Sequence, residues 1–141
     1  MASAPGQAPS PEVERALGSI RTMVLVALIF AIIIAILELV LLGDVIFIGA
    51  AVSKLGVVSP VASAELGLAG FLLVVLLVID VVVISRTWKM YSATKNGDIA
   101  ALKSLNSLGW AIVALIFAGV VAGVLLLIAY WRINDLPSPQ A

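Results

Sequence analysis

Long apolar runs separated by short polar stretches dominate the chain. Three of them cover residues 22–43, 66–84 and 108–131, each close to or above the ~20 residues that a helix needs to cross a bilayer. None alternates apolar and polar positions as the strands of a membrane barrel do. Because lipid offers no partner to backbone N–H and C=O groups, such segments form helices. The pattern predicts an all-α membrane protein, a bundle of three transmembrane helices.

The segment before the first run carries its own helix signal. Residues 1–9 form a Pro/Ala/Ser-rich stretch that is typical of a disordered tail. Residues 10–21 predict a short amphipathic lead-in helix, with Ser10 as N-cap and Pro11 at the first helical position. We expect this helix to lead directly into the first span.

The path of the chain between the first two spans is ambiguous. We expect residues 44–65 to form an outer loop, but the stretch VIFIGAAV at 45–52 is strongly apolar. It extends the first helix, lies on the membrane surface, or forms a fourth span with the residues that follow. A fourth span would separate the next, basic loop from the N-terminal tail, which disfavours it.

A basic loop over residues 85–107 connects the second and third spans. Asn96-Gly97 is a turn signal, and Asp98 is a suitable N-cap for a short interfacial helix over 99–105. The basic side chains provide a platform for anionic lipid or a partner, or they set only the topology. They are Arg86, Lys89, Lys95 and Lys103.

The distribution of basic residues predicts the orientation. Six of the eight Lys and Arg residues lie in the N-terminal segment and the 85–107 loop. The positive-inside rule places these segments in the cytoplasm. With three spans in the cell membrane, the N-terminus is then cytoplasmic, and the tail over 132–141, expected to be disordered, lies outside.

Composition excludes several function classes. The chain is 63% hydrophobic and 11% charged, whereas soluble domains carry about 25% charged residues. It has no Cys and no His, so thiolate chemistry and the commonest metal ligand are missing. No phosphate-binding loop or hydrolase motif occurs. We therefore expect no enzyme, cofactor or metal site, and nothing indicates nucleic-acid binding. The scarcity of Cys, Asn and Gln is typical of thermophiles.

Two acidic residues interrupt the spans. Asp80 is the one polar residue among the 14 from Phe71 to Ile84, and an acid inside a span is a candidate proton or ion site. The alternative is a hydrated carboxylate near the inner surface, or one paired with Arg21, Lys103 or the Asn106-Ser107 turn. Glu38 lies near the outer end of the first span. Counting along the spans separates the two acids by ~15 Å in depth, so we expect no carboxylate pair.

Small residues recur at helical spacing in the first and third spans. Such stripes let helices approach closely in lipid. We predict that the first and third spans pack side by side in parallel, with the second closing the bundle; self-association through the Gly pair is the alternative. The residues are Ala27, Ala31 and Ala35 in the first span, and Ala114, Ala118, Gly119, Ala122 and Gly123 in the third.

Three functional hypotheses follow. The first is a structural or accessory subunit that packs with other membrane subunits or with copies of itself. The second is a proton- or ion-handling subunit that uses Asp80 and Glu38. The third rests on a resemblance: the second and third spans, with their basic connecting loop, resemble the Ala/Gly/Val-rich helical hairpins of conjugative pilins. That resemblance implies a filament subunit, with a leader removed near residue 51.

Overall fold

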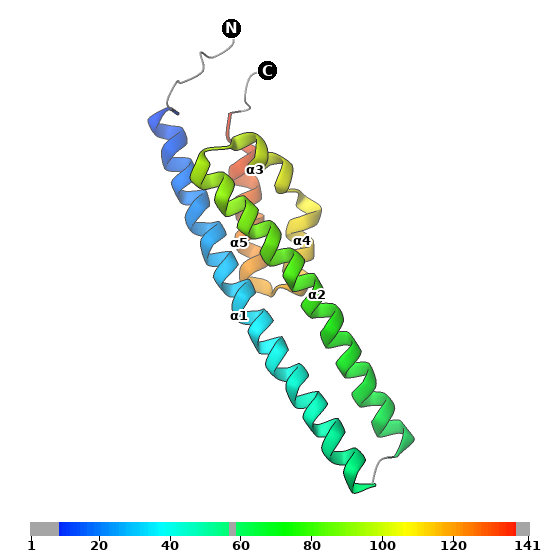
Figure 1. Cartoon of the computed structure of the whole chain (residues 1–141). Helices are drawn as coiled ribbons and strands as arrows, with labels where there is room; N and C mark the ends of the chain where they lie inside the picture. The colour runs from blue at the N-terminus through cyan, green and yellow to red at the C-terminus, as the bar shows by residue number, and fades with distance from the viewer. Residues whose placement is uncertain (1–8, 57–58, 138–141) are drawn as a thin grey trace.

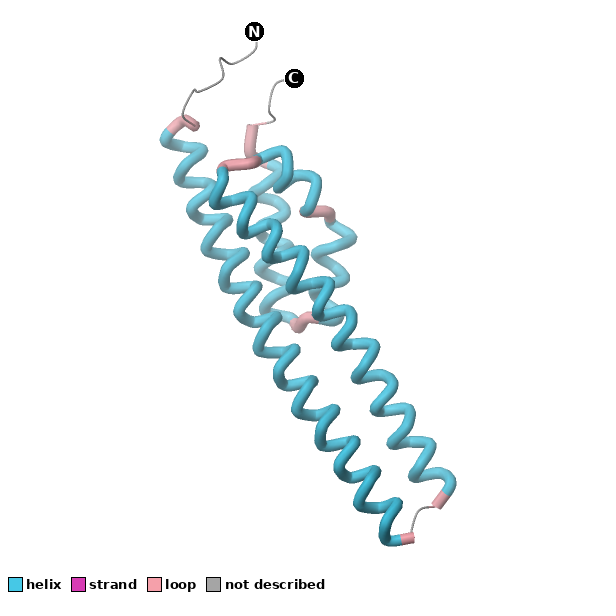
Figure 2. Tube along the Cα trace, viewed as in Figure 1, coloured by secondary structure: helices cyan, strands magenta, loops and turns pink. Residues whose placement is uncertain are grey.

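The computed structural model describes residues 9–56 and 59–137, which form helices joined by short turns (Figure 2). The helices are α1 (Pro11–Leu55), α2 (Pro60–Asn96), α3 (Ile99–Leu105), α4 (Leu108–Phe117) and α5 (Val120–Asn134). α1 and α2 are long and apolar enough to span a membrane, and α3 with α4 also qualifies, as one span bent by 59°. These candidate spans support a membrane location. Residues 1–8 of the tail expected over 1–9, and residues 138–141 of the tail expected over 132–141, lie outside the described part.

α1 is one continuous helix of 45 residues. It starts as predicted, with Ser10 as N-cap and Pro11 at the first position, and ends at Gly56, whose φ is +64°. Residues 45–52 extend this helix, which settles one ambiguity and reduces the expected outer loop to the turn before α2. Gly43 does not break α1, because a glycine inside a helix costs only ~1 kcal/mol. The apolar residues 45–52 that follow it favour a helix in lipid, where every backbone group needs a partner within the segment.

α2 runs well past the end of its apolar run. It starts at the Ser59-Pro60 cap and continues through the basic residues to Asn96, where Gly97 has φ +68°. The end of an apolar run therefore marks a change of surroundings, whereas the helix stops at its turn signal. The short helix predicted over 99–105 is present as α3, and Asp98 caps it by accepting a hydrogen bond from the Ala101 N–H at 2.9 Å.

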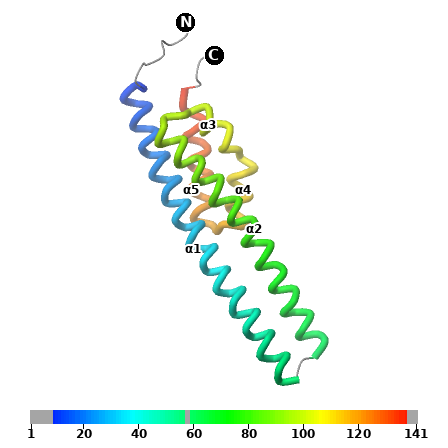
Figure 3. The backbone as a smooth tube through the Cα atoms, viewed as in Figure 1, coloured from blue at the N-terminus to red at the C-terminus, as the bar shows by residue number. Residues whose placement is uncertain are grey.

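The segment 108–131, expected as one straight span, is broken into α4 and α5. Gly119, with φ +91°, reverses the chain between them, so that the two helices form a second, shorter hairpin (Figures 1 and 3). α5 packs antiparallel to α1: Arg132 donates a hydrogen bond to Ser19, while Gly119 lies against Ile34. The predicted parallel packing of the first and third spans is wrong, because it assumed that the last span did not turn back.

Both ends of the described chain consequently lie at one end of the molecule (Figure 1). Lys103 of α3 donates to the carbonyl of Leu136 at 2.7 Å, which holds the C-terminal residues beside the basic segment. A straight third span would have placed residue 131 at the opposite end of the bundle from residue 22. Instead, the end of α5 lies beside the first turns of α1. The reason is again the reversal at Gly119.

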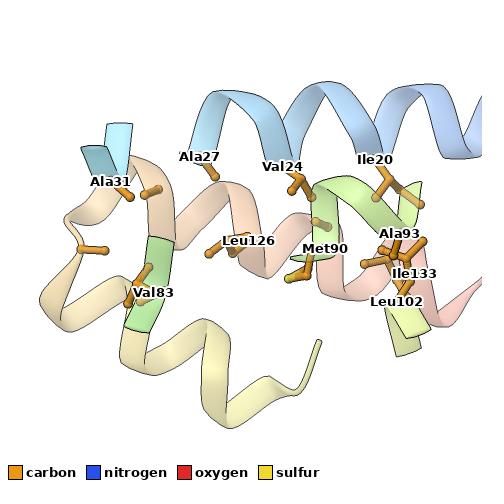
Figure 4. Packing of buried hydrophobic residues seen from close by; sticks show 14 of the residues in the cluster. Ile20, Val24, Ala27, Ala31, Val83, Met90, Ala93, Leu102, Leu126 and Ile133 are labelled. Atoms are coloured by element: carbon orange, nitrogen blue, oxygen red, sulfur yellow. The ribbon is translucent and has the colours of Figure 1, made fainter. Parts of the chain in front are cut away.

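The buried core lies in the half of the molecule that contains the chain ends. In α1 every buried residue falls between Leu17 and Ala31, and in α2 between Asp80 and Thr94. Figure 4 shows Ile20, Val24 and Ala27 of α1 beside Leu126 and Met90. We call this half the bundle. The remainder, residues 39–55 and 60–78, projects beyond it and is called the extended hairpin (Figure 1).

Candidate functional site

The α1–α2 hairpin brings Glu38 and Asp80 together. Glu38 lies 17 residues before Leu55, and Asp80 lies 20 residues after Pro60. Antiparallel helices place side by side those residues that are about equally far from their turn, and the carboxyl groups of Glu38 and Asp80 lie close enough to influence each other electrostatically. The predicted ~15 Å separation is wrong. The prediction counted the depth of each acid from the ends of the apolar runs. The register between α1 and α2 is instead set by the turn of the hairpin.

Asp80 is completely buried at this interface, and Glu38 is half-buried. Neither carboxylate oxygen of Asp80 accepts a hydrogen bond from any described residue, and the same holds for Oε2 of Glu38. Buried carboxylates normally receive two or more hydrogen bonds or a basic partner. The pair is therefore an exception that the packing of the bundle does not explain.

The basic partners that the sequence offered to Asp80 are engaged elsewhere. Arg21 donates to the hydroxyl of Tyr91 at 3.4 Å and lies over its ring. Lys103 donates to the Leu136 carbonyl. The side chain of Asn106 is buried without a hydrogen bond to the described residues and does not donate to Asp80.

The pair lies where the bundle gives way to the extended hairpin. Val83, one turn beyond Asp80, packs in the same buried cluster as Ala31 and Ala118 (Figure 4). A methyl group on Gly119 would lie 3.5 Å from the side chain of Ile34, one turn before Glu38. The turn between α4 and α5 thus closes the bundle at the level of the two acids.

A polar line continues from Asp80 along the buried face of α2. Thr87 is completely buried, and its hydroxyl has no hydrogen-bond partner in the described part of the chain. Thr94 is also buried, but its hydroxyl donates to the Tyr91 carbonyl at 2.6 Å. Thr87 and Tyr91 share the helical face of Asp80, which extends the polar surface from the pair toward the chain ends.

The small residues singled out in the sequence pack within the chain. Ala27 and Ala31 are buried in α1 and Ala35 is half-buried, while Ala114, Ala118 and Ala122 are buried at the α4–α5 hairpin. Gly119 forms the turn. Gly123 packs so closely against α4 that a methyl group there would overlap the backbone of Leu115. The Gly pair is thus used inside the fold: Gly119 makes the chain reversal, and Gly123 follows it in α5.

The basic residues of the predicted loop lie on α2 and α3. Arg86 donates through Nε to the Leu105 carbonyl at 2.8 Å, and its guanidinium lies 4.7 Å from the centre of the Trp110 ring. Lys89 and Lys95 are exposed. Across residues 9–56 and 59–137, no group of three or more acidic side chains is arranged to hold a metal ion.

Two neighbouring carboxyl groups whose buried oxygens receive no hydrogen bond from the described residues have a restricted chemistry. When both are ionised they repel each other, and in an apolar interior that repulsion is strong. A proton shared between them, or a small cation held by their oxygens, removes it. The pair can therefore take up and release a positive charge.

No protein family, curated protein or solved structure matched the chain. The carboxyl pair was also missed by reasoning from the sequence, although a signal was present. Gly56 and Ser59-Pro60 are adjacent stop and start signals, and counting outward from them places Glu38 opposite Asp80.

Proposed function

We propose that this chain is a non-enzymatic membrane subunit that assembles with other transmembrane helices, either its own copies or partner subunits, through the extended hairpin. The observation that carries the proposal is the apolar surface of that hairpin. Large hydrophobic side chains are exposed on both of its helices, among them Phe47 (75% exposed), Phe71 (65%) and Ile46 (64%). Because only two helices form the extended hairpin, its apolar surface is available to contact lipid or other helices.

A groove between the two helices of the extended hairpin supports assembly. It has a volume of about 720 Å³ and a mostly apolar lining that includes Gly49, Gly67 and Gly70. Small residues let another helix approach the backbone, and close packing drives helix association in lipid. At ~1.5 Å per residue, α1 and α2 also exceed the ~30 Å core of a bilayer, so they have length to spare for contacts between subunits.

The charges support an orientation with both chain ends in the cytoplasm. Seven of the eight basic residues lie on the bundle, and Lys54 alone lies at the tip of the extended hairpin. The positive-inside rule assigns the bundle end to the cytoplasm. The proposed topology keeps the cytoplasmic N-terminus expected from the sequence and adds the C-terminal end of α5 to the same side.

Native mass spectrometry of the protein gently extracted from its own membranes tests the assembly. We expect a defined homo-oligomer or a complex with foreign subunits. Phe47→Ala and Phe71→Ala should each weaken it by about tenfold, because truncated aromatic anchors typically cost more than 1 kcal/mol. Ile116→Ala, on the exposed face of α4, is the control. A monomer, or equal effects of all three variants, would contradict the proposal, whereas filaments of a chain trimmed near residue 51 would support the pilin hypothesis.

The Glu38–Asp80 pair supports a second function, the handling of protons or small cations within that subunit. Its basis is a completely buried carboxylate that has a second acid as its neighbour and no described donor. Such groups inside a membrane usually belong to a proton or ion path. The buried Thr87 on the same face of α2 extends a polar route toward the bundle end.

Proton flux into liposomes that contain the purified protein tests this second function. Asp80→Asn keeps the size of the side chain and removes its charge, so flux should fall to background while the oligomer mass stays unchanged. Asp44→Asn, at an exposed position on α1, is the matched control and should retain flux. Wild-type liposomes that leak no faster than protein-free ones would eliminate this function and leave the assembly role intact.

A further inference from the structure

A long groove follows an exposed face of α2, between Val74 and Lys89. Its upper part, of about 340 Å³, lies beside the end of α3, and its lower part, of about 380 Å³, reaches α1 at Leu42. Val81 and Val82 line both parts, so the two are continuous.

The two parts of the groove differ in chemistry. The upper part is lined by the polar and basic side chains of Ser85, Arg86 and Lys89, together with Leu105. Below Val81, every lining residue is aliphatic: Leu42, Val74, Leu77 and Val78. The groove is therefore cationic at its upper end, which lies on the bundle, and apolar along the rest of its length.

The basic side chains are placed to meet an anion at the rim. Arg86 is held there by its hydrogen bond to the Leu105 carbonyl and by its position over the Trp110 ring. Lys89 is exposed one turn further along α2. Trp88, 58% exposed, lies beside it at the level where aromatic residues commonly meet lipid headgroups.

The length of the apolar part fits one leaflet. From Val74 to Ser85 the helix advances 11 residues, or about 16 Å. Half of the ~30 Å hydrocarbon core of a bilayer is about 15 Å. A chain anchored at the basic end would thus follow the groove to the middle of the membrane.

We propose that this groove binds an anionic phospholipid. The phosphate contacts Ser85, Arg86 and Lys89, and one acyl chain lies along Val81, Val78 and Val74. In a phospholipid an anionic headgroup is followed by an aliphatic chain. In the groove the cationic residues are likewise followed by a row of valines. The proposal rests on the membrane location proposed above. It defines the site on α2 at which the basic residues of the region 85–107 recognise lipid.

The test uses the full-length protein in bilayer nanodiscs and the lipids phosphatidylglycerol and phosphatidylcholine with identical acyl chains. After gentle release, native mass spectrometry should detect phosphatidylglycerol bound preferentially to the wild type. Lys89→Gln should lower that binding about fivefold, the effect of losing one basic contact at an anionic surface. Lys95→Gln removes the same charge from the same end of α2 outside the groove and should leave binding unchanged. Val82→Trp, which fills the junction of the two parts, should abolish it.

The outcomes separate this proposal from the one on which it rests. Equal binding of the two lipids, or equal effects of Lys89→Gln and Lys95→Gln, would overturn the lipid site and leave the membrane subunit standing. So would a photo-crosslinker at Val82 that captures a polypeptide instead of lipid. Failure of the wild type to enter nanodiscs would overturn both proposals. Selective loss with Lys89→Gln and Val82→Trp would support the site.

Discussion

Asp80 carries most of the functional argument at the scale of single residues. A completely buried carboxylate is costly unless another group compensates its charge, and the fold gives it Glu38 where a basic residue would be usual. We therefore expect the two acids to act as a unit, so that substitution of either one changes the electrostatic environment of the other. Their coupling can be measured independently of any transport assay.

A double-mutant cycle should show this coupling. Glu38→Gln and Asp80→Asn each replace one carboxyl group by an amide of equal size, and their effects on the free energy of unfolding in detergent should be non-additive by about 0.5–3 kcal/mol. Asp44→Asn with Asp80→Asn is the control cycle and should be additive. Additivity in both cycles would show that the two carboxyl groups do not interact.

A second prediction at the scale of single residues concerns the close packing of Gly123. Because a methyl group there would overlap the Leu115 backbone, Gly123→Ala should destabilise the protein by about 1–3 kcal/mol in chemical denaturation. Gly18→Ala has open space around the new methyl group and should be neutral or stabilising by up to ~1 kcal/mol. Equal stability of the two variants would mean that α4 and α5 are not in close contact.

At the scale of elements, the α4–α5 hairpin determines the shape of the bundle. A continuous helix over 108–131 would lie along α1 in the opposite direction to α5. The reversal at Gly119 instead lets α5 cover the α1 residues that form the core, and no Cα atom of α4 lies within 8 Å of α1. Of the two helices of this hairpin, α5 is therefore the one that packs on α1.

Engineered cysteine pairs distinguish the two arrangements, and the chain has no Cys of its own. Ser19→Cys with Arg132→Cys should cross-link efficiently with a short thiol reagent, since the two native side chains are hydrogen-bonded. Ser19→Cys with Gly109→Cys should not. The reverse result would indicate one uninterrupted span.

At the scale of the whole molecule, the distribution of charge follows the division into bundle and extended hairpin. The bundle carries seven basic residues and both ends of the described chain, whereas the extended hairpin is mainly apolar. In the topology proposed above, the basic end lies at the cytoplasmic surface, and the apolar arm lies in the membrane interior against neighbouring helices.

Thiol labelling in sealed vesicles tests this topology. Cysteines introduced at Glu12 and Asn134, near the two chain ends, should react from the same side with a membrane-impermeant reagent. A cysteine at Ser53, near the tip of the extended hairpin, should react from the opposite side. Labelling of positions 12 and 134 from opposite sides would restore the three-span topology expected from the sequence.

The sequence by itself determined the helical class and those helix ends that carry a local cap or turn signal. Ser10-Pro11, Asn96-Gly97 and the 99–105 helix follow from local cap and turn chemistry, which needs no knowledge of distant residues. The tertiary structure alone decided which residues meet. Glu38 faces Asp80 because the hairpin turn fixes the register over some twenty residues on each side.

The reversal at Gly119 was decided in the same way. A Gly-x-x-x-Gly stretch is compatible both with a straight helix that packs on a neighbour and with a turn, since glycine tolerates negative and positive φ. The packing of α5 on α1 and of Gly123 on Leu115 selects the turn. The contacts of α5 with α1 join residues far apart in the chain, such as Ser19 and Arg132, and their energies cannot be read from a local pattern.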